Sequence, residues 1–310
     1  MNYQTDNFWM QMQAYLPPHN RLANDTPPQE YFIDYERFSI HLDHYLHPKP
    51  KGRLLLLHGV GGNGRLLSFI AEPLHRAGYD VICPDLPLYG CTGYSGTITY
   101  ADWVDVAKML VHRFSDISPL FVFGLSAGGL LAYQAACGCA QVRGIIATCV
   151  LDQRDAYITK KTAVNPLLGA IAPPFLKAAA KLLPELRLPM KAIANMKRIS
   201  NNKEVSNLLM RDEKSAGIRV PLSFAATMIS PELETEPEDF TQCPFLLVHP
   251  EADYWTDVSL SLRFFKKLAC PKTLRMLEGA GHFPIEQLGL EQLERYILDF
   301  TDGLCADTQG

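Results

Sequence analysis

The chain has 310 residues, of which 47% are hydrophobic and 20% are charged. This length and composition are typical of a globular protein with a large core, organised either as one α/β domain or as a domain that carries an insertion. The formal net charge of -4 gives no electrostatic reason to expect a nucleic acid partner.

The sequence shows no targeting or anchoring segment. Residues 1–10 lack the basic and apolar regions of a secretory leader, and no apolar run in the chain reaches the length of a membrane span. The 8 cysteines lack the Cys-x-x-Cys spacing of zinc sites, and several fall inside apolar strands. We therefore expect free thiols, no transmembrane segment and a cytoplasmic location.

The first part of the chain predicts an N-terminal segment followed by two strands. Residues 1–28 are polar and interrupted by prolines, which is consistent with a leading helix or a loose arm. Alternation over residues 31–46 predicts two short antiparallel strands joined near Glu36. One face of the second strand would carry four polar side chains: His41, Asp43, Tyr45 and His47. We interpret this as a solvated strand face and not as a metal site, because no third element supplies obvious ligands.

A glycine-rich loop follows the next predicted strand. Residues 53–57 predict a buried strand, and the loop after it leads into a helix predicted over residues 65–77. The glycine spacing differs from that of a dinucleotide fingerprint, and no Gly-Lys-Ser/Thr follows as in a phosphate loop. So dense a glycine loop must expose backbone N–H groups, and we predict that it binds developing negative charge. Its supporting residues are His58, Gly59, Gly61 and Gly62.

Strands and helices then alternate as far as residue 151. The pattern predicts a strand over residues 79–83 and a helix that begins after Thr99, which forms a capping box with Asp102. Further strands are predicted over residues 120–123 and 144–150. Such alternation is typical of a parallel sheet with helices on both faces.

The stretch from residue 119 to 133 is the centre of the functional prediction. It reads as a buried strand, the pentapeptide Gly124-Leu125-Ser126-Ala127-Gly128 and a helix. This is the context of a nucleophile elbow, in which a serine on a strained turn projects its hydroxyl. Gly124 and Gly128 would let neighbouring backbone approach closely. The alternative is that Ser126 is an ordinary helix N-cap.

The alternation breaks at residue 152. As far as residue 240 the pattern is helical, irregular and rich in proline, and an insertion of this length is too long for a loop. We expect a small helical cap there, before strands over residues 245–249 and 273–277, each followed by a helix. The predicted organisation is an arm or helix over 1–28, a core over 29–151 and 241–303, and a cap, or lid, over 152–240.

The loops after the last two strands supply partners for Ser126. A serine nucleophile needs a base that is oriented by a third group, and in a doubly wound sheet both come from loops at the carboxyl ends of later strands. These loops contain Asp253 and, between a glycine and a proline-started helix, His282. We predict His282 as the base and Asp253 as the orienting acid. Glu251 and Asp257 are weaker candidates, because an acid at a helix start, such as Asp257, is explained by the helix dipole.

Four motifs fall in the chain order of the α/β-hydrolases: His58-Gly-Val-Gly-Gly, Gly124-Leu-Ser-Ala-Gly, Glu251-Ala-Asp253 and Gly281-His282. Over about residues 30 to 302 the chain resembles the monoacylglycerol lipase and lysophospholipase-like group of that family. The resemblance implies a mostly parallel eight-stranded sheet with helices on both faces and a helical cap after the sixth strand. It also implies catalytic residues Ser126, Asp253 and His282, with the backbone N–H groups of Val60 and Ala127 as the oxyanion hole.

The function implied by this resemblance is hydrolysis of a carboxylic ester through an acyl-enzyme. The partner would be a small-molecule ester with a hydrophobic acyl group. No cofactor or metal would be needed for the reaction. The protein could be a monomer or a homodimer. On the same fold the alternatives are an amidase or peptidase, a thioesterase and a carbon–carbon bond hydrolase. The non-enzymatic alternative is a ligand-binding module, which the combined presence of nucleophile, base, acid and oxyanion loop argues against.

Overall fold

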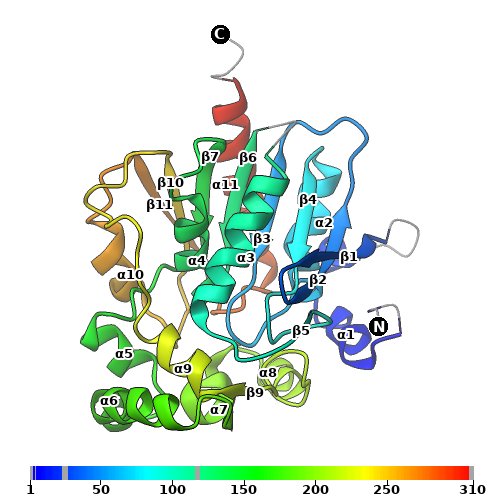
Figure 1. The fold of residues 1–310 in the computed structure, drawn as a ribbon. Helices are drawn as coiled ribbons and strands as arrows, with labels where there is room; N and C mark the ends of the chain where they lie inside the picture. The colour runs from blue at the N-terminus through cyan, green and yellow to red at the C-terminus, as the bar shows by residue number, and fades with distance from the viewer. Residues whose placement is uncertain (1–2, 4, 23–26, 116–118, 307–310) are drawn as a thin grey trace.

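A nine-stranded sheet forms the centre of the computed structural model, which describes residue 3 and residues 5–22, 27–115 and 119–306 (Figure 1). Eight strands follow the order β1-β2-β4-β3-β6-β7-β10-β11, and β5 pairs with β2. The eight expected strands are therefore present, and β5 is an addition. The strands are β1 (Gln29–Tyr35), β2 (Phe38–Tyr45), β3 (Arg53–Leu57), β4 (Asp80–Pro84), β5 (Gly93–Tyr94), β6 (Leu120–Gly124), β7 (Val142–Ala147), β10 (Phe245–Pro250) and β11 (Lys272–Leu277).

The sheet is parallel from β4 to β11 and antiparallel at the β1–β2 edge. The central strands β4, β6 and most of β3 are fully buried, which explains their nearly continuous apolar sequences. β7 ends at Ala147, three residues earlier than the sequence pattern predicts, and the hydroxyl of the next residue, Thr148, accepts the N–H of Ser126.

Helices cover both faces of the sheet, as expected. In Figure 1, α3 and α4 lie on the near face, and α2 and α11 lie behind it. The capping box of Thr99 and Asp102 is present at the start of α3. None of the helices in the described part of the chain has both the length and the hydropathy that a membrane span requires. The helices of the core are α2 (Ser68–Arg76), α3 (Tyr100–Arg113), α4 (Ala127–Ala136), α10 (Val258–Phe265) and α11 (Gln287–Ala306).

The strand order reverses direction between β3 and β6. From β3 the chain continues to β4 on one side, whereas from β6 it continues to β7, β10 and β11 on the other side. In open α/β sheets the crevice outside the carboxyl ends of two such strands is the usual ligand site. Leu57 and Gly124 are paired at these ends, so the glycine loop and Ser126 emerge next to each other.

The segment between β7 and β10 is mostly helical. Figure 1 shows its elements gathered beyond one end of the sheet, below α4. They are α5 (Ala156–Thr162), α6 (Pro166–Leu182), β8 (Arg187–Pro189), α7 (Met190–Ile193), α8 (Lys203–Leu209), β9 (Arg219–Pro221) and α9 (Leu222–Met228). β8 and β9 pair as a small antiparallel sheet of their own.

The N-terminal segment packs on the body and covers one face of β2. It contains α1 (Asn7–Gln13), whose Trp9 and Met12 are buried, and the hydroxyl of Tyr3 donates a hydrogen bond to Asp85. The interpretation of this face as a solvated strand face is therefore wrong, because His41, Asp43 and Tyr45 are 1%, 0% and 2% exposed. The strand pattern alone gives no sign that a distant segment covers it.

The buried face of β2 contains an ion cluster in which Arg65 and His41 face three carboxylates. The guanidinium donates to both carboxylate oxygens of Asp43 at 2.6 and 2.9 Å and lies 3.0 Å from Glu30. The His41 ring is 3.1 Å from Glu30 and 3.0 Å from Asp85. Burial alone would lower the pKa of His41, but the hydrogen bonds with Asp85 and Glu30 outweigh it and raise the pKa to about 9. His41 is therefore protonated at neutral pH.

The first prediction concerns the pH dependence of stability. His41 binds a proton more tightly in the folded than in the unfolded chain, so its contribution is complete below pH 6.5 and is lost as the pH rises through about 9. Between these values the free energy of unfolding of the wild type should fall more steeply than that of His41→Gln, by about 1.4 kcal/mol per pH unit. Urea unfolding at a series of pH values measures the two slopes. His112→Gln, on the exposed side of α3, should keep the wild-type slope; equal slopes for wild type and His41→Gln would contradict the account.

Candidate active site

Ser126 occupies a strained turn between β6 and α4. Its φ is 58°, a left-handed conformation that is uncommon for a residue other than glycine. The turn requires close backbone contacts: a Cβ on Gly124 would lie 1.9 Å from the carbonyl oxygen of Gly128, and a Cβ on Gly128 would lie 2.3 Å from that of Leu57. The N–H of Ser126 donates to the hydroxyl of Thr148 at 3.1 Å. Both flanking glycines are therefore required by the packing, as the sequence motif predicts.

The glycine loop after β3 packs directly against this turn. A Cβ on Gly59 would lie 2.7 Å from the carbonyl oxygen of Leu125 and 2.9 Å from the backbone nitrogen of Ala127. Gly61 has a φ of 82°, and the N–H of Gly62 donates to the carbonyl of Gly59 at 3.1 Å. The glycines thus hold the loop at backbone contact with the serine turn.

The imidazole of His282 lies between Ser126 and Asp253. Its Nε2 is 2.7 Å from the hydroxyl oxygen of Ser126, and its Nδ1 is 2.8 Å from Oδ2 of Asp253. The three side chains come from loops that are far apart in the sequence, and all three are buried. Because the Asp253 carboxylate accepts from Nδ1–H, Nε2 is left to accept a hydrogen bond from the serine hydroxyl.

Asp253 is held as a carboxylate. Its Oδ1 accepts the backbone N–H groups of Trp255 and Thr256 at 2.9 and 2.8 Å. Burial raises the pKa of Asp253, but the neighbouring His282 and the hydrogen bonds from Thr256 outweigh burial and hold the pKa well below its usual range.

The two competing acids lie elsewhere. Asp257 is the exposed N-cap of α10 and accepts the N–H of Ser259 at 2.9 Å. Glu251 is exposed and accepts the N–H of Gly279 at 3.1 Å. The hydrogen bonds of the described residues therefore connect His282 to Asp253 and not to either alternative.

Two residues at the site were missed by the sequence analysis. The Thr256 hydroxyl donates to Oδ2 of Asp253 at 2.7 Å, and its oxygen lies 3.1 Å from Nδ1 of His282. The indole ring of Trp255 packs 4.7 Å from the imidazole ring of His282. Their position two and three residues after Asp253 is a signal that could have indicated them, since an acid in a tight loop is usually bonded by the residues that follow it.

Two backbone N–H groups next to Ser126 donate no hydrogen bond to any residue that the structure describes. Val60 and Ala127 line the same pocket as Ser126. Among the hydrogen bonds of the described residues, none is donated by the N–H of Val60 or Ala127. Ala127 is the first residue of α4, where the helix dipole favours negative charge.

His58 fixes the glycine loop to the loop after β4. Its Nε2 accepts the backbone N–H of Leu86 at 3.0 Å, and its Nδ1 lies 2.8 Å from the carbonyl oxygen of Gly59, to which it donates. Burial lowers the pKa of His58 to about 4, so the ring is neutral at pH 7 and its tautomer is set by these two bonds. His58 therefore supports the loop without facing the pocket beside Ser126.

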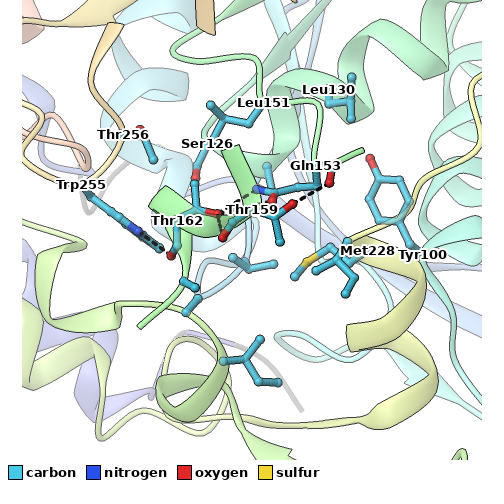
Figure 2. A pocket seen from close by; sticks show the side chains of 16 residues that line it. Tyr100, Ser126, Leu130, Leu151, Gln153, Thr159, Thr162, Met228, Trp255 and Thr256 are labelled. Carbon is cyan, nitrogen blue, oxygen red and sulfur yellow. Dashed lines mark hydrogen bonds between the residues drawn. The ribbon is translucent and has the colours of Figure 1, made fainter. Parts of the chain in front are cut away.

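A pocket of about 100 Å³ opens beside Ser126. In Figure 2, Trp255 and Thr256 lie on one side of it, Tyr100 and Met228 lie on the other, and Gln153 and Thr159 lie between. Its walls come from the glycine loop, α3, α4, the loops after β7 and β10, and three elements of the inserted segment, α5, α7 and α9. The pocket-lining residues outside the motifs were not predicted, because no sequence pattern shows which faces of an irregular insertion meet the core.

The comparison with protein families assigns the chain to a family. A family model described as serine aminopeptidase, S33, matches residues 48–286, which contain Ser126, Asp253 and His282. The chain belongs to the serine aminopeptidase S33 family. It is therefore an α/β-hydrolase enzyme, as the sequence resemblance implied.

Solved structures similar to this S33 family member share its fold. A soluble variant of monoglyceride lipase from Saccharomyces cerevisiae is 18% identical, with a TM-score of 0.76 over 93% of this chain and 99% of that one. Monoacylglycerol lipase from Paleococcus ferrophilus is 21% identical, with a TM-score of 0.69 over 86% of this chain and 99% of that one. Mouse alpha/beta hydrolase domain-containing protein 10 is 18% identical, with a TM-score of 0.64 over 89% and 99% of the two chains.

One curated protein also matches. The magnesium-chelatase 30 kDa subunit of Rhodobacter capsulatus is 39% identical over 88 residues, which are 27% of this chain. The match spans 29% of the length of that relative.

The second prediction tests the close packing of the serine turn. A Cβ at position 128 would meet the backbone oxygens of Leu57 and His58 at 2.3 and 2.9 Å, so Gly128→Ala should lower the free energy of unfolding by about 1–3 kcal/mol. Gly303→Ala is the matched control: it lies within α11, where a Cβ meets nothing within 4 Å, and it should raise stability by about 0.5–1 kcal/mol. Urea unfolding measures both changes. A Gly128→Ala variant as stable as the wild type would contradict the packing argument.

Proposed function

We propose that this α/β-hydrolase cleaves carboxylic esters through an acyl-enzyme on Ser126. The observation that supports this most is the 2.7 Å contact between the Ser126 hydroxyl and Nε2 of His282, whose other nitrogen is bonded to Asp253. In the proposed reaction the serine oxygen attacks the ester carbonyl while its proton moves to His282. The ester C–O bond then breaks, and His282 returns the proton to the departing alcohol. A water molecule repeats the sequence to release the acid.

The negative charge of the tetrahedral intermediate would be bound by the free N–H groups of Val60 and Ala127. Each such donor contributes about 3 kcal/mol in related acyl-transfer reactions. Asp253 would fix the tautomer of His282 and stabilise the imidazolium that forms after proton transfer. Thr256 is placed to hold the Asp253 carboxylate in that orientation through its 2.7 Å hydrogen bond.

The pocket supports an ester as substrate over the N-terminus of a peptide. An aminopeptidase must bind a free ammonium group, which requires a carboxylate or another strong acceptor near the nucleophile. None of the described residues that line the pocket is an Asp or a Glu. The structural similarity to enzymes described as monoglyceride and monoacylglycerol lipases is a second argument for esters.

The proposal includes the inserted segment as a cap. α5, α7 and α9 contribute Thr159, Thr162, Ile193 and Met228 to the pocket, so residues 152–240 would roof the acyl group. None of the 8 cysteines, all of which lie in the described part of the chain, forms a disulfide, which supports a reducing compartment and hence the proposed cytoplasmic location.

The third prediction tests the nucleophile and the base. Ser126→Ala and His282→Gln should each lower kcat for p-nitrophenyl butyrate by a factor on the order of 10⁴ to 10⁶. No other described group is placed to act as the nucleophile in the first variant or as the base that activates Ser126 in the second. Ser259→Ala, on the exposed surface of α10, is the control and should retain wild-type activity. Initial rates on protein with an unchanged circular dichroism spectrum provide the measurement. Substantial activity in folded Ser126→Ala would rule out the proposal.

The fourth prediction separates the two candidate acids. Asp253→Asn should lower kcat on the order of 10⁴-fold, because the amide favours the wrong tautomer of His282. Asp257→Asn should change kcat less than about twofold, since an N-cap asparagine replaces an N-cap aspartate well. The same ester assay compares them. A larger loss in Asp257→Asn than in Asp253→Asn would show that the orienting acid has been misassigned.

A further inference from the structure

The pocket beside Ser126 is small. Its volume is about 100 Å³, whereas an engineered apolar cavity of about 150 Å³ takes up a benzene molecule. An acyl group attached to Ser126 and lying in this pocket therefore has room for no more than about five carbons.

Hydrogen bonds attach α5, which forms one wall of the pocket, to the core. The carbonyl oxygen of Thr162 accepts the indole N–H of Trp255 at 3.1 Å, and the Gln153 amide donates to the Thr162 hydroxyl at 3.2 Å. At the start of the same helix, Asp155 accepts a charged hydrogen bond from Arg263 at 2.5 Å. Widening the pocket on this side would break contacts with the core.

Hydrogen bonds also attach α9, which forms another wall of the pocket, to the core. The hydroxyl of Thr227 accepts the backbone N–H of Tyr100 at 2.8 Å, and the hydroxyl of Ser223 donates to the carbonyl of Ile98 at 2.7 Å. These two bonds attach α9 to the core, and α9 ends at Met228, which lines the pocket. Both α5 and α9 are therefore attached to the core, which limits how far the pocket can widen.

A second void, on the other side of Ser126, is too small to hold the acyl chain instead. It is lined by the glycine loop, Ser126 and His282, and its volume is about 20 Å³. A space of about 10 to 15 Å³ is enough for one water molecule, so this void has room for a water molecule but not for an alkyl chain.

The chemistry of the pocket favours an uncharged acyl group. None of its described lining residues carries a formal charge at neutral pH. The polar side chains among them are already bonded: Thr159 donates to the carbonyl of Gln153 at 2.7 Å, and Tyr100 donates to Gln134 at 3.0 Å. A charged group on the acyl chain would have no partner there.

We propose that this enzyme is selective for compact, uncharged acyl groups of about two to five carbons and discriminates against long alkyl chains. The inference rests on the proposed role of Ser126 and adds the class of acyl group to it. Met228 sets the end of the pocket in this account.

A series of p-nitrophenyl esters tests the proposal, because the leaving group is the same throughout and only the acyl group varies. We expect the largest kcat/KM with acetate or butyrate and a fall of at least about tenfold by octanoate. Dodecanoate should be poorer still. All assays are run below the aggregation limit of the longest ester. A maximum at hexanoate or any longer ester overturns the proposal.

Met228→Ala tests whether the pocket wall sets this limit. It should raise the ratio of kcat/KM for octanoate to that for butyrate about tenfold. Met10→Ala removes the same side chain from a 50% exposed position on α1 and should leave the ratio unchanged. As a second variant, Ala163→Leu narrows the pocket and should lower butyrate hydrolysis relative to acetate. An unchanged profile in folded Met228→Ala and Ala163→Leu overturns the proposal.

These outcomes are distinct from failure of the proposed function. If Ser126→Ala abolishes hydrolysis but long esters are preferred, the size limit is wrong and the serine mechanism stands. If hydrolysis of every ester survives in Ser126→Ala, the serine mechanism is wrong.

Discussion

The left-handed backbone of Ser126 is the constraint on which the site depends. A serine at φ 58° is tolerated only because its neighbours have no side chains at the points of contact. Gly124 and Gly128 approach each other within the turn, and Gly59 brings the glycine loop after β3 against Leu125. The same contacts that strain the turn therefore place a projecting hydroxyl beside two free N–H groups. Local strain is offset by the packing of the surrounding sheet, in which β6 is fully buried.

Sheet topology supplies the remaining groups. β10 and β11 are parallel neighbours on the same side of β6, so the loops that leave their carboxyl ends lie side by side. One loop contributes Asp253 and the other His282, and their side chains meet at 2.8 Å. Residues 156 positions apart in the chain, Ser126 and His282, thus become hydrogen-bonded partners. The insertion between β7 and β10 leaves this geometry intact because it lies beyond the strand ends and forms the other wall of the pocket.

The core of this arrangement was predictable from sequence, and its surroundings were not. Short apolar runs predict the buried strands, and Gly-x-Ser-x-Gly predicts the serine turn. Both predictions succeed because each structure is determined by residues that are adjacent in the sequence. Thr256, Met228 and the walls of the pocket depend on which distant surfaces meet. The same is true of His41, which looks like part of a solvated strand face but is covered by Tyr3 and bonded to Glu30. The burial of His41 could not be predicted from the strand pattern, because it depends on how the N-terminal segment packs against β2 in the folded protein.

The central claim is that the hydroxyl of Ser126 is a nucleophile activated by His282. A fluorophosphonate probe tests it most directly, because the probe forms a stable bond only with an activated serine and does not depend on the identity of the acyl group. Peptide mass spectrometry of the labelled wild-type protein should locate one adduct on Ser126, and His282→Gln should label far more slowly. Folded wild-type protein that remains unlabelled, or that is labelled at another serine, would contradict the account.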